Sequence, residues 1–248
     1  MRKNFLCLLA SAAVLSLASC TTTKFVPDGS YLLDEVKIRT DQKNIRPSSL
    51  RMYVRQNPNA KWFSLIKTQL YVYNLSGRDS TKWGNKFLRR IGDAPVIYSE
   101  DEAQRSEEKI TKAVHNMGYM AATVKRSTKV KKKKIKVYYD VTAGKPYVVQ
   151  SIKYDIYDPK IAALLKQDSA RSLLKEGMYF DVNVLDADRQ RITNKLLRNG
   201  YYKFNKDYIG YTADTVRNTY NVDLTQHLQM YKAHANDSAR AHRQYWIN

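Results

Sequence analysis

Residues 192–202 read ITNKLLRNGYY, and a second version of this stretch, ITKAVHNMGYM, occupies residues 110–120. In both copies apolar residues recur every third or fourth position, which is typical of a helix with one buried face. Each helix is predicted to end at a glycine, because glycine readily adopts the left-handed conformation that closes many helices. The copies lie 82 residues apart, so we predict two tandem units of roughly 80 residues each.

The overall composition limits the classes of protein to which the chain can belong. Of the 248 residues, 43% are hydrophobic and 27% are charged, which is typical of folded globular domains and argues against a largely disordered chain. The formal net charge of +20 predicts attraction to nucleic acid, anionic lipid headgroups or acidic partners. The compartment in which the protein works decides among these partners.

The N-terminus predicts export. In residues 1–19, Met1 is followed by two basic residues and then by an apolar run that is too short for a mature membrane-spanning helix, as in a signal peptide. Residues 17–20, LASC, resemble a bacterial lipobox, which implies cleavage before Cys20 and acylation of that residue. An ordinary cleaved signal with a chance cysteine is the alternative. Export argues against a nucleic-acid partner.

The predicted anchor leaves no disulfide. The second cysteine, Cys7, lies in the signal, so no pair of free thiols remains in the mature chain. An anchor with several acyl chains holds a protein on a bilayer effectively permanently. Thr21–Thr23 contains no acidic residue, which favours the periplasmic face of the outer membrane. Residues 20–30 form the predicted tether.

The same order of elements is predicted in both units. The first unit covers residues 31–145 and the second covers 146–231, each reading as strand, helix, helix, strand, strand. Alternating apolar residues over 135–141 are typical of a half-buried strand. Asp158 followed by Pro159 is a helix start signal. These patterns predict an α+β fold with tandem β-α-α-β-β domains.

Three segments fall outside this repeat. Residues 57–98 are an insertion in the first unit, and residues 232–248 are a linker with Tyr245–Ile247 as the opening strand of a truncated third unit. The insertion combines aromatic and basic residues, which is typical of membrane-interface segments. The alternative is that it packs on the core of its own unit. The side chains for possible membrane contact are Trp62, Phe63, Trp83, Phe87, Arg89 and Arg90.

A run of lysines at residues 131–134 lies between two predicted strands and has two interpretations. It is either a solvated hairpin turn, whose charges also prevent pairing with other strands, or a patch that faces anionic headgroups. The first interpretation is the more common one for such a run.

The ordered set of motifs resembles the polypeptide-transport-associated (POTRA) domains of the BamA/TamA outer-membrane assembly superfamily. The resemblance is closest to the lipidated branch, the translocation and assembly module lipoproteins (TamL). It covers essentially the whole mature chain. Besides the lipobox and the two Gly-Tyr pairs, it is carried by VPDGSYLL at 26–33, YVYNLSG at 71–77, APVIY at 94–98, NMGY at 116–119, GKPY at 144–147 and FNKDYI at 204–209.

The resemblance implies the following fold and mechanism. Each unit is expected to be a small mixed three-stranded sheet packed on two helices, and the strand after each Gly-Tyr is expected at the sheet edge. An open edge can bind an extended segment of a client or partner by adding it as a further strand, called β-augmentation. The side chains predicted on these edges are Tyr119, Ala122, Val124 and Arg126 in the first unit and Tyr201, Phe204 and Tyr208 in the second.

The resemblance also implies partners that this chain does not contain. Such proteins continue into a membrane β-barrel, and no tract of barrel strands occurs here. The chain is therefore expected to be an N-terminal fragment or a split form beside a separate barrel subunit. The implied partners are that barrel, unfolded outer-membrane protein clients, the membrane itself and an assembly partner linked to the inner membrane.

An enzymatic function has little support in the sequence. The histidines show no paired metal-ligand spacing, and neither a phosphate-binding glycine loop nor a Gly-x-Ser-x-Gly motif occurs. We therefore predict no cofactor and no metal. Two other functions stay open, namely domains that only space the anchor from a barrel, and a lipid-anchored protein that binds an acidic ligand such as cell-wall polymer or lipopolysaccharide.

Overall fold

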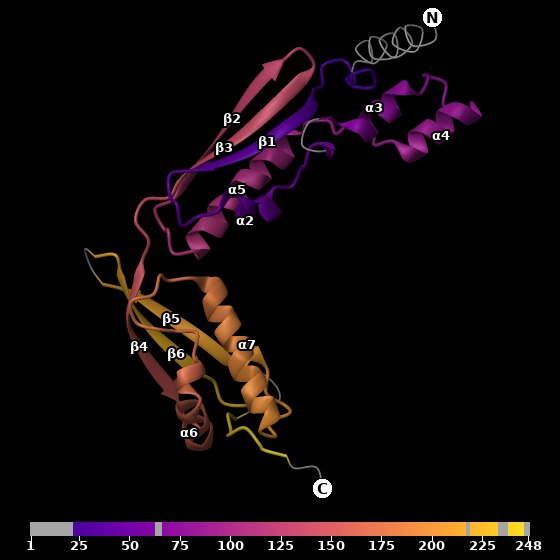
Figure 1. Cartoon of the computed structure of the whole chain (residues 1–248). Coiled ribbons are helices and arrows are strands. Elements are labelled where there is room, and N and C mark those ends of the chain that lie inside the picture. Colours follow the sequence, from indigo (N-terminus) through magenta and orange to yellow (C-terminus); the bar gives the residue numbers. More distant parts are fainter. Residues whose placement is uncertain (1–21, 63–65, 217–218, 233–237, 246–248) are drawn as a thin grey trace, which may run out of the picture. The chain divides into compact units, whose positions relative to one another are not determined.

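The computed structural model describes residues 22–62, 66–216, 219–232 and 238–245. The chain forms two compact units, each with its own three-stranded sheet (Figure 1). The first unit takes the chain up to Thr111 together with Thr123–Thr142, and the second takes Lys112–Ala122 and the chain from Ala143 onward. Three predictions lie outside the described residues: the signal peptide with its lipidation site Cys20, the side chain of Phe63, and the strand continuing through Trp246 and Ile247.

The first unit interrupts its β-α-α-β-β order with the insertion. Its strands and helices are β1 (Leu32–Thr40), α2 (Pro47–Leu50), a 3-10 turn (Arg51–Tyr53), α3 (Thr68–Leu75), α4 (Trp83–Ile91), α5 (Glu100–Asn116), β2 (Thr123–Lys131) and β3 (Lys134–Thr142). The sheet has the order β1-β3-β2, with β1 parallel and β2 antiparallel to the central strand β3.

Strand β3 is central because its side chains alternate between the core and the other face. Ile135, Val137 and Val141 are almost fully buried, and the residues between them are half-buried. Tyr139 is also buried, and its hydroxyl donates a hydrogen bond to the Ala103 carbonyl on α5 at 3.1 Å. This period of two is what places one face of a sheet against a helix. The strand therefore joins the sheet to α5.

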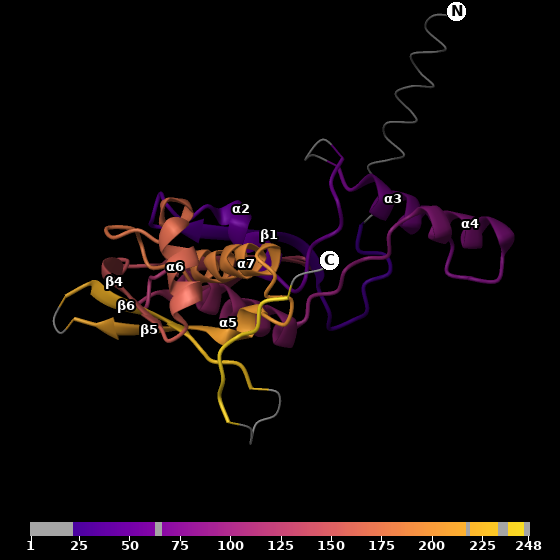
Figure 2. The same ribbon diagram turned by 90° about the horizontal axis from the view of Figure 1, so that it is seen from below.

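The second unit follows the same order without an insertion. Its elements are β4 (Val148–Ile156), α6 (Pro159–Gln167), a 3-10 turn (Ser169–Arg171), α7 (Val182–Arg198), a second 3-10 turn (Lys206–Tyr208), β5 (Ile209–Thr215) and β6 (Asn221–Leu228). Its sheet has the order β4-β6-β5, again with one parallel and one antiparallel pair. Figure 2 shows α6 and α7 on the same face of this sheet.

The helix starts of the second unit follow from local chemistry. The Asp158 carboxylate accepts hydrogen bonds from the backbone N–H groups of Lys160 and Ile161. Asp181 accepts one from the Asn183 N–H at 2.7 Å. These caps satisfy amide groups that have no partner within the helix. The predicted start of α6 at Asp158-Pro159 is therefore confirmed, and α7 begins at Val182, directly after its cap Asp181.

The two sheets also repeat an irregularity that the sequence does not reveal. In β1 the pairing register shifts between Leu33 and Glu35, and in β4 it shifts between Val149 and Ser151. In both units the residue before the shift donates its N–H to a segment outside the sheet, because Leu33 bonds the Val96 carbonyl and Val149 bonds the Met178 carbonyl. A β-bulge bends the strand and increases its twist at that point. The two units thus repeat each other in structure as well as in sequence.

The glycine after each long helix has a second role besides ending it. Gly118 and Gly200 have φ of 89° and 86°, so both positions favour glycine. Within the second unit, each also accepts a backbone hydrogen bond through its carbonyl, from the Tyr147 N–H at 2.9 Å and from the Tyr245 N–H at 2.8 Å respectively. Tyr147 immediately precedes strand β4.

The insertion is tied to the first unit through α3, and α3 and α4 extend away from the sheet (Figures 1 and 2). Leu70 of α3 is fully buried and belongs to a cluster with Val26 and Leu32. The ammonium of Lys67 is buried and donates to the Asp34 carboxylate at 3.0 Å. Burial lowers the pKa of Lys67, although the bond to Asp34 opposes this shift.

The predicted fold class is confirmed. Each unit is a β-α-α-β-β arrangement in which a mixed three-stranded sheet packs with helices. The lysine run forms the turn of the β2–β3 hairpin, with Lys132 at a φ of 55°. The first helix is short, since α2 and its 3-10 extension stop at Tyr53. Arg55 then leaves the helix, because its backbone N–H bonds the Ser106 hydroxyl on α5.

Candidate functional site

The strands after the two Gly-Tyr pairs lie at sheet edges. β2 and β5 each pair with one neighbouring strand in the described chain, and no described segment pairs with the opposite side of either strand. Such an edge presents a row of backbone donors and acceptors. The location of both strands at edges agrees with the sequence analysis.

The direction of the free backbone groups in β2 follows from the hydrogen bonds of β3. The Val141 carbonyl accepts from the Asp41 N–H at the end of β1, so the backbone groups of Val141 face β1 and not β2. Val141 stands opposite Val124, and alternate pairs in an antiparallel ladder share this property. The residues whose N–H and C=O groups face away from the sheet are therefore Val124, Arg126, Thr128 and Val130.

The same reasoning applies to β5. The N–H of Gln229 bonds the Tyr208 carbonyl, and the N–H of Val216 bonds the Asn221 carbonyl, so these pairs are hydrogen-bonded across the hairpin. By alternation the backbone of Ala213 and of the other odd-numbered residues in β5 faces away from the sheet. Ala213 is solvent-exposed. The second edge is shorter than the first, with seven residues against nine.

The opposite edges of the two sheets are partly covered. An isolated bridge pairs Leu32 of β1 with Ile97, and another pairs Val148 of β4 with Tyr179. Covering an edge in this way removes the groups to which a further strand would bind. In each unit the strand after the Gly-Tyr pair is thus the more open edge.

Two of the residues predicted on the first edge lie in β2 and two precede it. Tyr119 and Ala122 are buried and belong to a turn in which the Ala122 N–H bonds the Tyr119 carbonyl at 3.0 Å. Val124 is buried against the core, so only its backbone reaches the edge. The half of β2 that continues to the hairpin, residues 127–131, is exposed.

The prediction for the second edge is wrong in its boundaries. The sequence predicts a strand from Tyr201, but β5 begins at Ile209, so Tyr201, Phe204 and Tyr208 all precede it. Tyr201 and Phe204 are buried in the core cluster of the second unit, and Tyr208 ends a 3-10 turn. The cause is a turn after Gly200, in which the Phe204 N–H bonds the Tyr201 carbonyl at 2.9 Å. Their aromatic composition reflects core packing.

The guanidinium of Arg126 is occupied within the protein. It contacts the Glu100 carboxylate at 2.6 Å, the Glu107 carboxylate at 3.1 Å and the Tyr98 hydroxyl at 3.0 Å. The bond to Glu100 raises the pKa of Arg126. Burial, together with the hydrogen bond to Glu100, raises the pKa of Tyr98 to about 12. Arg126 therefore attaches β2 to α5, and only its backbone is available at the edge.

Helix α4 carries an exposed apolar stripe. Trp83, Phe87 and Ile91 follow at four-residue intervals, and Trp83 is 83% exposed. Residues four apart lie on the same side of a helix. The Trp83 and Phe87 rings stack with centroids 6.1 Å apart. An adjacent stripe of exposed cations, Lys82, Lys86 and Arg90, follows the same interval.

The other residues of this predicted surface differ in their surroundings. Arg89 points into the insertion, where it donates to the Gly77 carbonyl at 2.9 Å and the Ser76 hydroxyl at 3.2 Å. Its guanidinium also lies 5.1 Å from the centre of the Phe25 ring. Trp62 is 64% exposed at an isolated β-bridge with Ile66. Trp62, Trp83, Phe87 and Arg90 are thus exposed, whereas Arg89 has a structural position.

The described part of the chain contains neither a candidate metal site nor a candidate membrane-spanning helix. Its histidine, aspartate and glutamate side chains do not gather in groups of three or more that could hold a metal ion. Within the same residues, every helix is too short or too polar to cross a bilayer.

Comparison with known proteins identifies the family. Residues 31–144 and 158–225 match the family described as "POTRA: Surface antigen variable number repeat". The two matched ranges together cover most of the chain. They include the whole first sheet and, in the second sheet, β5 and most of β6, whereas β4 lies between the two ranges. No curated protein matches the sequence.

Solved structures with similarity to this chain come from several bacteria. Domains POTRA3-5 of BamA from Haemophilus influenzae are 16% identical, with a TM-score of 0.40 over 82% of this chain and 68% of that chain. BamA from Haemophilus ducreyi lacking POTRA domains 1-3 is 17% identical, with a TM-score of 0.39 over 80% of this chain and 29% of that chain. POTRA1-2 of the periplasmic domain of Omp85 from Anabaena is 14% identical, with a TM-score of 0.34 over 82% and 98%.

Proposed function

Because the chain belongs to the POTRA family, we propose that it is the non-enzymatic periplasmic scaffold of an outer-membrane protein assembly factor. In this proposal its open strand edges bind extended segments of clients or partners by β-augmentation. Main-chain pairing depends little on side chains, so one edge can accept many client sequences. The observation that carries the proposal is the edge strand β2, whose exposed half has backbone groups facing away from the sheet.

Proline at Thr128 is expected to weaken client binding about ten-fold, because it removes one outward N–H and obstructs the addition of a strand. Thr128 is exposed, and its N–H does not pair with β3, so the sheet keeps its own hydrogen bonds. The ligand is a fluorescent peptide with the alternating apolar and polar residues of a membrane β-strand. Fluorescence anisotropy gives the dissociation constant.

The matched control is Thr128→Ala, which removes the side chain but keeps the N–H. It should bind the peptide like the wild type. Far-UV circular dichroism verifies that the proline variant keeps its fold. If folded Thr128→Pro and Ala213→Pro both bind the peptide with wild-type affinity, neither edge is the binding site and the proposal fails.

We further propose that the protein is a lipoprotein of the TamL type, anchored in the outer membrane through Cys20. The lipobox LASC at residues 17–20 and the preceding apolar run support this proposal. Intact mass spectrometry of the native protein should show a chain that lacks residues 1–19 and carries the mass of acyl chains at Cys20. A mature chain that begins elsewhere or is unacylated would contradict the anchor.

The partners we propose are a membrane β-barrel, in the same chain or as a separate subunit, unfolded outer-membrane clients, and an assembly partner linked to the inner membrane. A third POTRA unit is proposed to begin near Tyr245. In support, the Tyr245 N–H bonds the Gly200 carbonyl in the same way as the Tyr147 N–H, just before β4, bonds the Gly118 carbonyl. The proposed unit boundaries stay at residues 31–145 and 146–231.

A further inference from the structure

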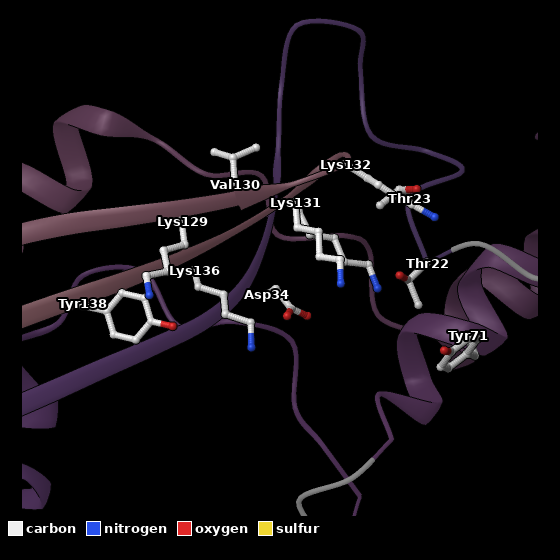
Figure 3. A pocket seen from close by; sticks show the side chains of 11 residues that line it. Thr22, Thr23, Asp34, Tyr71, Lys129, Val130, Lys131, Lys132, Lys136 and Tyr138 are labelled. Atoms are coloured by element: carbon white, nitrogen blue, oxygen red, sulfur yellow. The ribbon is translucent and has the colours of Figure 1, made fainter.

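A basic cleft of about 800 Å³ lies between the β2–β3 hairpin and α3 in the first unit (Figure 3). Thr22 and Thr23 line one side of the cleft, and Tyr71 of α3 lies near them. The hairpin side is lined by lysines. They are Lys129, Lys131, Lys132, Lys134 and Lys136. Asp34 is the one carboxylate among the described lining residues.

The carboxylates nearest to the cleft are already engaged. Asp34 binds the buried Lys67 at 3.0 Å, and Asp28 binds Lys133 of the hairpin turn at 2.5 Å. Glu35 is shared between Lys136 at 2.8 Å and Lys37 at 3.2 Å. In the described chain, no carboxylate lies within ion-pair distance of the four remaining lining lysines, Lys129, Lys131, Lys132 and Lys134. The cleft therefore has an uncompensated positive charge.

The register of the hairpin makes this charge unfavourable for the free protein. Lys129 stands directly opposite Lys136, and Lys131 stands directly opposite Lys134. Like charges in directly opposite positions of two strands destabilise a sheet. A solvated hairpin does not require two such pairs on one face. Glu35 partly compensates Lys136, whereas Lys129, Lys131 and Lys134 have no carboxylate partner in the described chain. A bound anion would relieve the repulsion that remains, so the arrangement favours an anion-binding surface.

We propose that this cleft binds the phosphate headgroups of anionic phospholipids at the membrane surface next to the lipid anchor. Thr22 is two residues after Cys20, and two residues span about 7 Å at most. The membrane as source of the phosphate thus rests on the proposed anchoring at Cys20, which would hold the cleft at the bilayer. The exposed Trp83, Phe87 and Ile91 of α4 belong to the same unit and are a second feature typical of an interfacial segment.

The test measures vesicle binding of the mature chain with Cys20→Ser, which cannot be acylated at that position. Without an acyl chain, binding reports the cleft separately from the anchor, and no client peptide is present. The probes are vesicles of phosphatidylcholine alone and vesicles that also contain phosphatidylglycerol. We expect binding to the anionic vesicles only. A variant with neutral cleft lysines is expected to bind them at least about ten-fold more weakly. Its substitutions are Lys129→Gln, Lys131→Gln, Lys134→Gln and Lys136→Gln.

A matched control removes the same charge from exposed lysines of the second unit. It should keep wild-type binding within about three-fold. Its substitutions are Lys153→Gln, Lys160→Gln, Lys166→Gln and Lys175→Gln. Thermal unfolding verifies the fold of both variants. The cleft variant loses the opposed lysine pairs but also the Lys136–Glu35 ion pair, so we expect an unfolding temperature close to that of the wild type.

Three results would overturn the proposal. Equal binding by the wild type and a folded cleft variant would exclude the cleft. Equal weakening by the control would show that only net charge matters. Displacement from vesicles by inorganic phosphate, at an ionic strength where chloride does not displace the protein, would assign the cleft to a soluble phosphate compound instead of a membrane.

Discussion

Replacing Arg191 with alanine should lower the free energy of unfolding of the second unit by about 3–5 kcal/mol. The Arg191 guanidinium bonds the Asp188 carboxylate through Nε at 2.7 Å and the Asp168 carboxylate through Nη1 at 2.5 Å. The Asp188 side chain is fully buried, and the Asp168 side chain is 5% exposed. Removal of the arginine leaves two buried negative charges with weaker partners. Such a loss exceeds that of an exposed ion pair several-fold.

Urea unfolding followed by circular dichroism measures this effect. Arg198→Ala is the matched control, because Arg198 is exposed in the last turn of the same helix and should contribute less than about 1 kcal/mol. An Arg191→Ala variant as stable as Arg198→Ala would show that the cluster does not stabilise the unit.

Gly200→Ala should destabilise the second unit by about 2–5 kcal/mol, as the sum of two effects. The φ of 86° disfavours any residue with a side chain by about 1–2 kcal/mol. A Cβ atom at this position would also lie 2.6 Å from the Tyr245 carbonyl oxygen, so the C-terminal segment would have to move. Overpacking of this kind adds about 1–3 kcal/mol.

Gly177→Ala separates the two effects. Gly177 has a φ of 82°, but nothing lies within 4 Å of the position of its Cβ. This control should therefore show only the conformational effect of about 1–2 kcal/mol. Thermal unfolding of both variants gives the difference, and hydrogen exchange at the Tyr245 amide shows whether its bond to Gly200 is lost. Equal stability of the two variants would mean that the Tyr245 segment does not pack on Gly200 in solution.

Most of the architecture could be predicted from local patterns. The alternation over residues 135–141 predicts a half-buried strand. The side chains of β3 alternate between buried and half-buried positions, as predicted. The helical period before Gly118 and Gly200 predicts helices that end where α5 and α7 end. Such patterns succeed because a residue's spacing along a helix or strand decides which face it occupies.

The second edge strand shows where local patterns fail. Aromatic residues after Gly200 have strand-like composition, yet Tyr201 and Phe204 occupy the core. Burial of large aromatic surface outweighs a local preference for extended backbone, and the chain turns before β5 begins. A turn signal was present in Asn205, whose side chain accepts from the Asp207 N–H at 2.8 Å.

The edge location of the strands after Gly118-Tyr119 and Gly200-Tyr201 was expected from the resemblance to POTRA domains. By itself, the sequence determined the tandem β-α-α-β-β units, the C-terminal ends of the two long helices, and the insertion. Each depends on residues within one or two elements, where periodicity and turn chemistry act. Only the tertiary structure decided which groups meet across the fold. Thr22 and Lys131 are distant in the chain but line one cleft, and Asp168 and Arg191 form one buried pair. Burial and charge pairing depend on three-dimensional distance, which spacing along a chain does not encode.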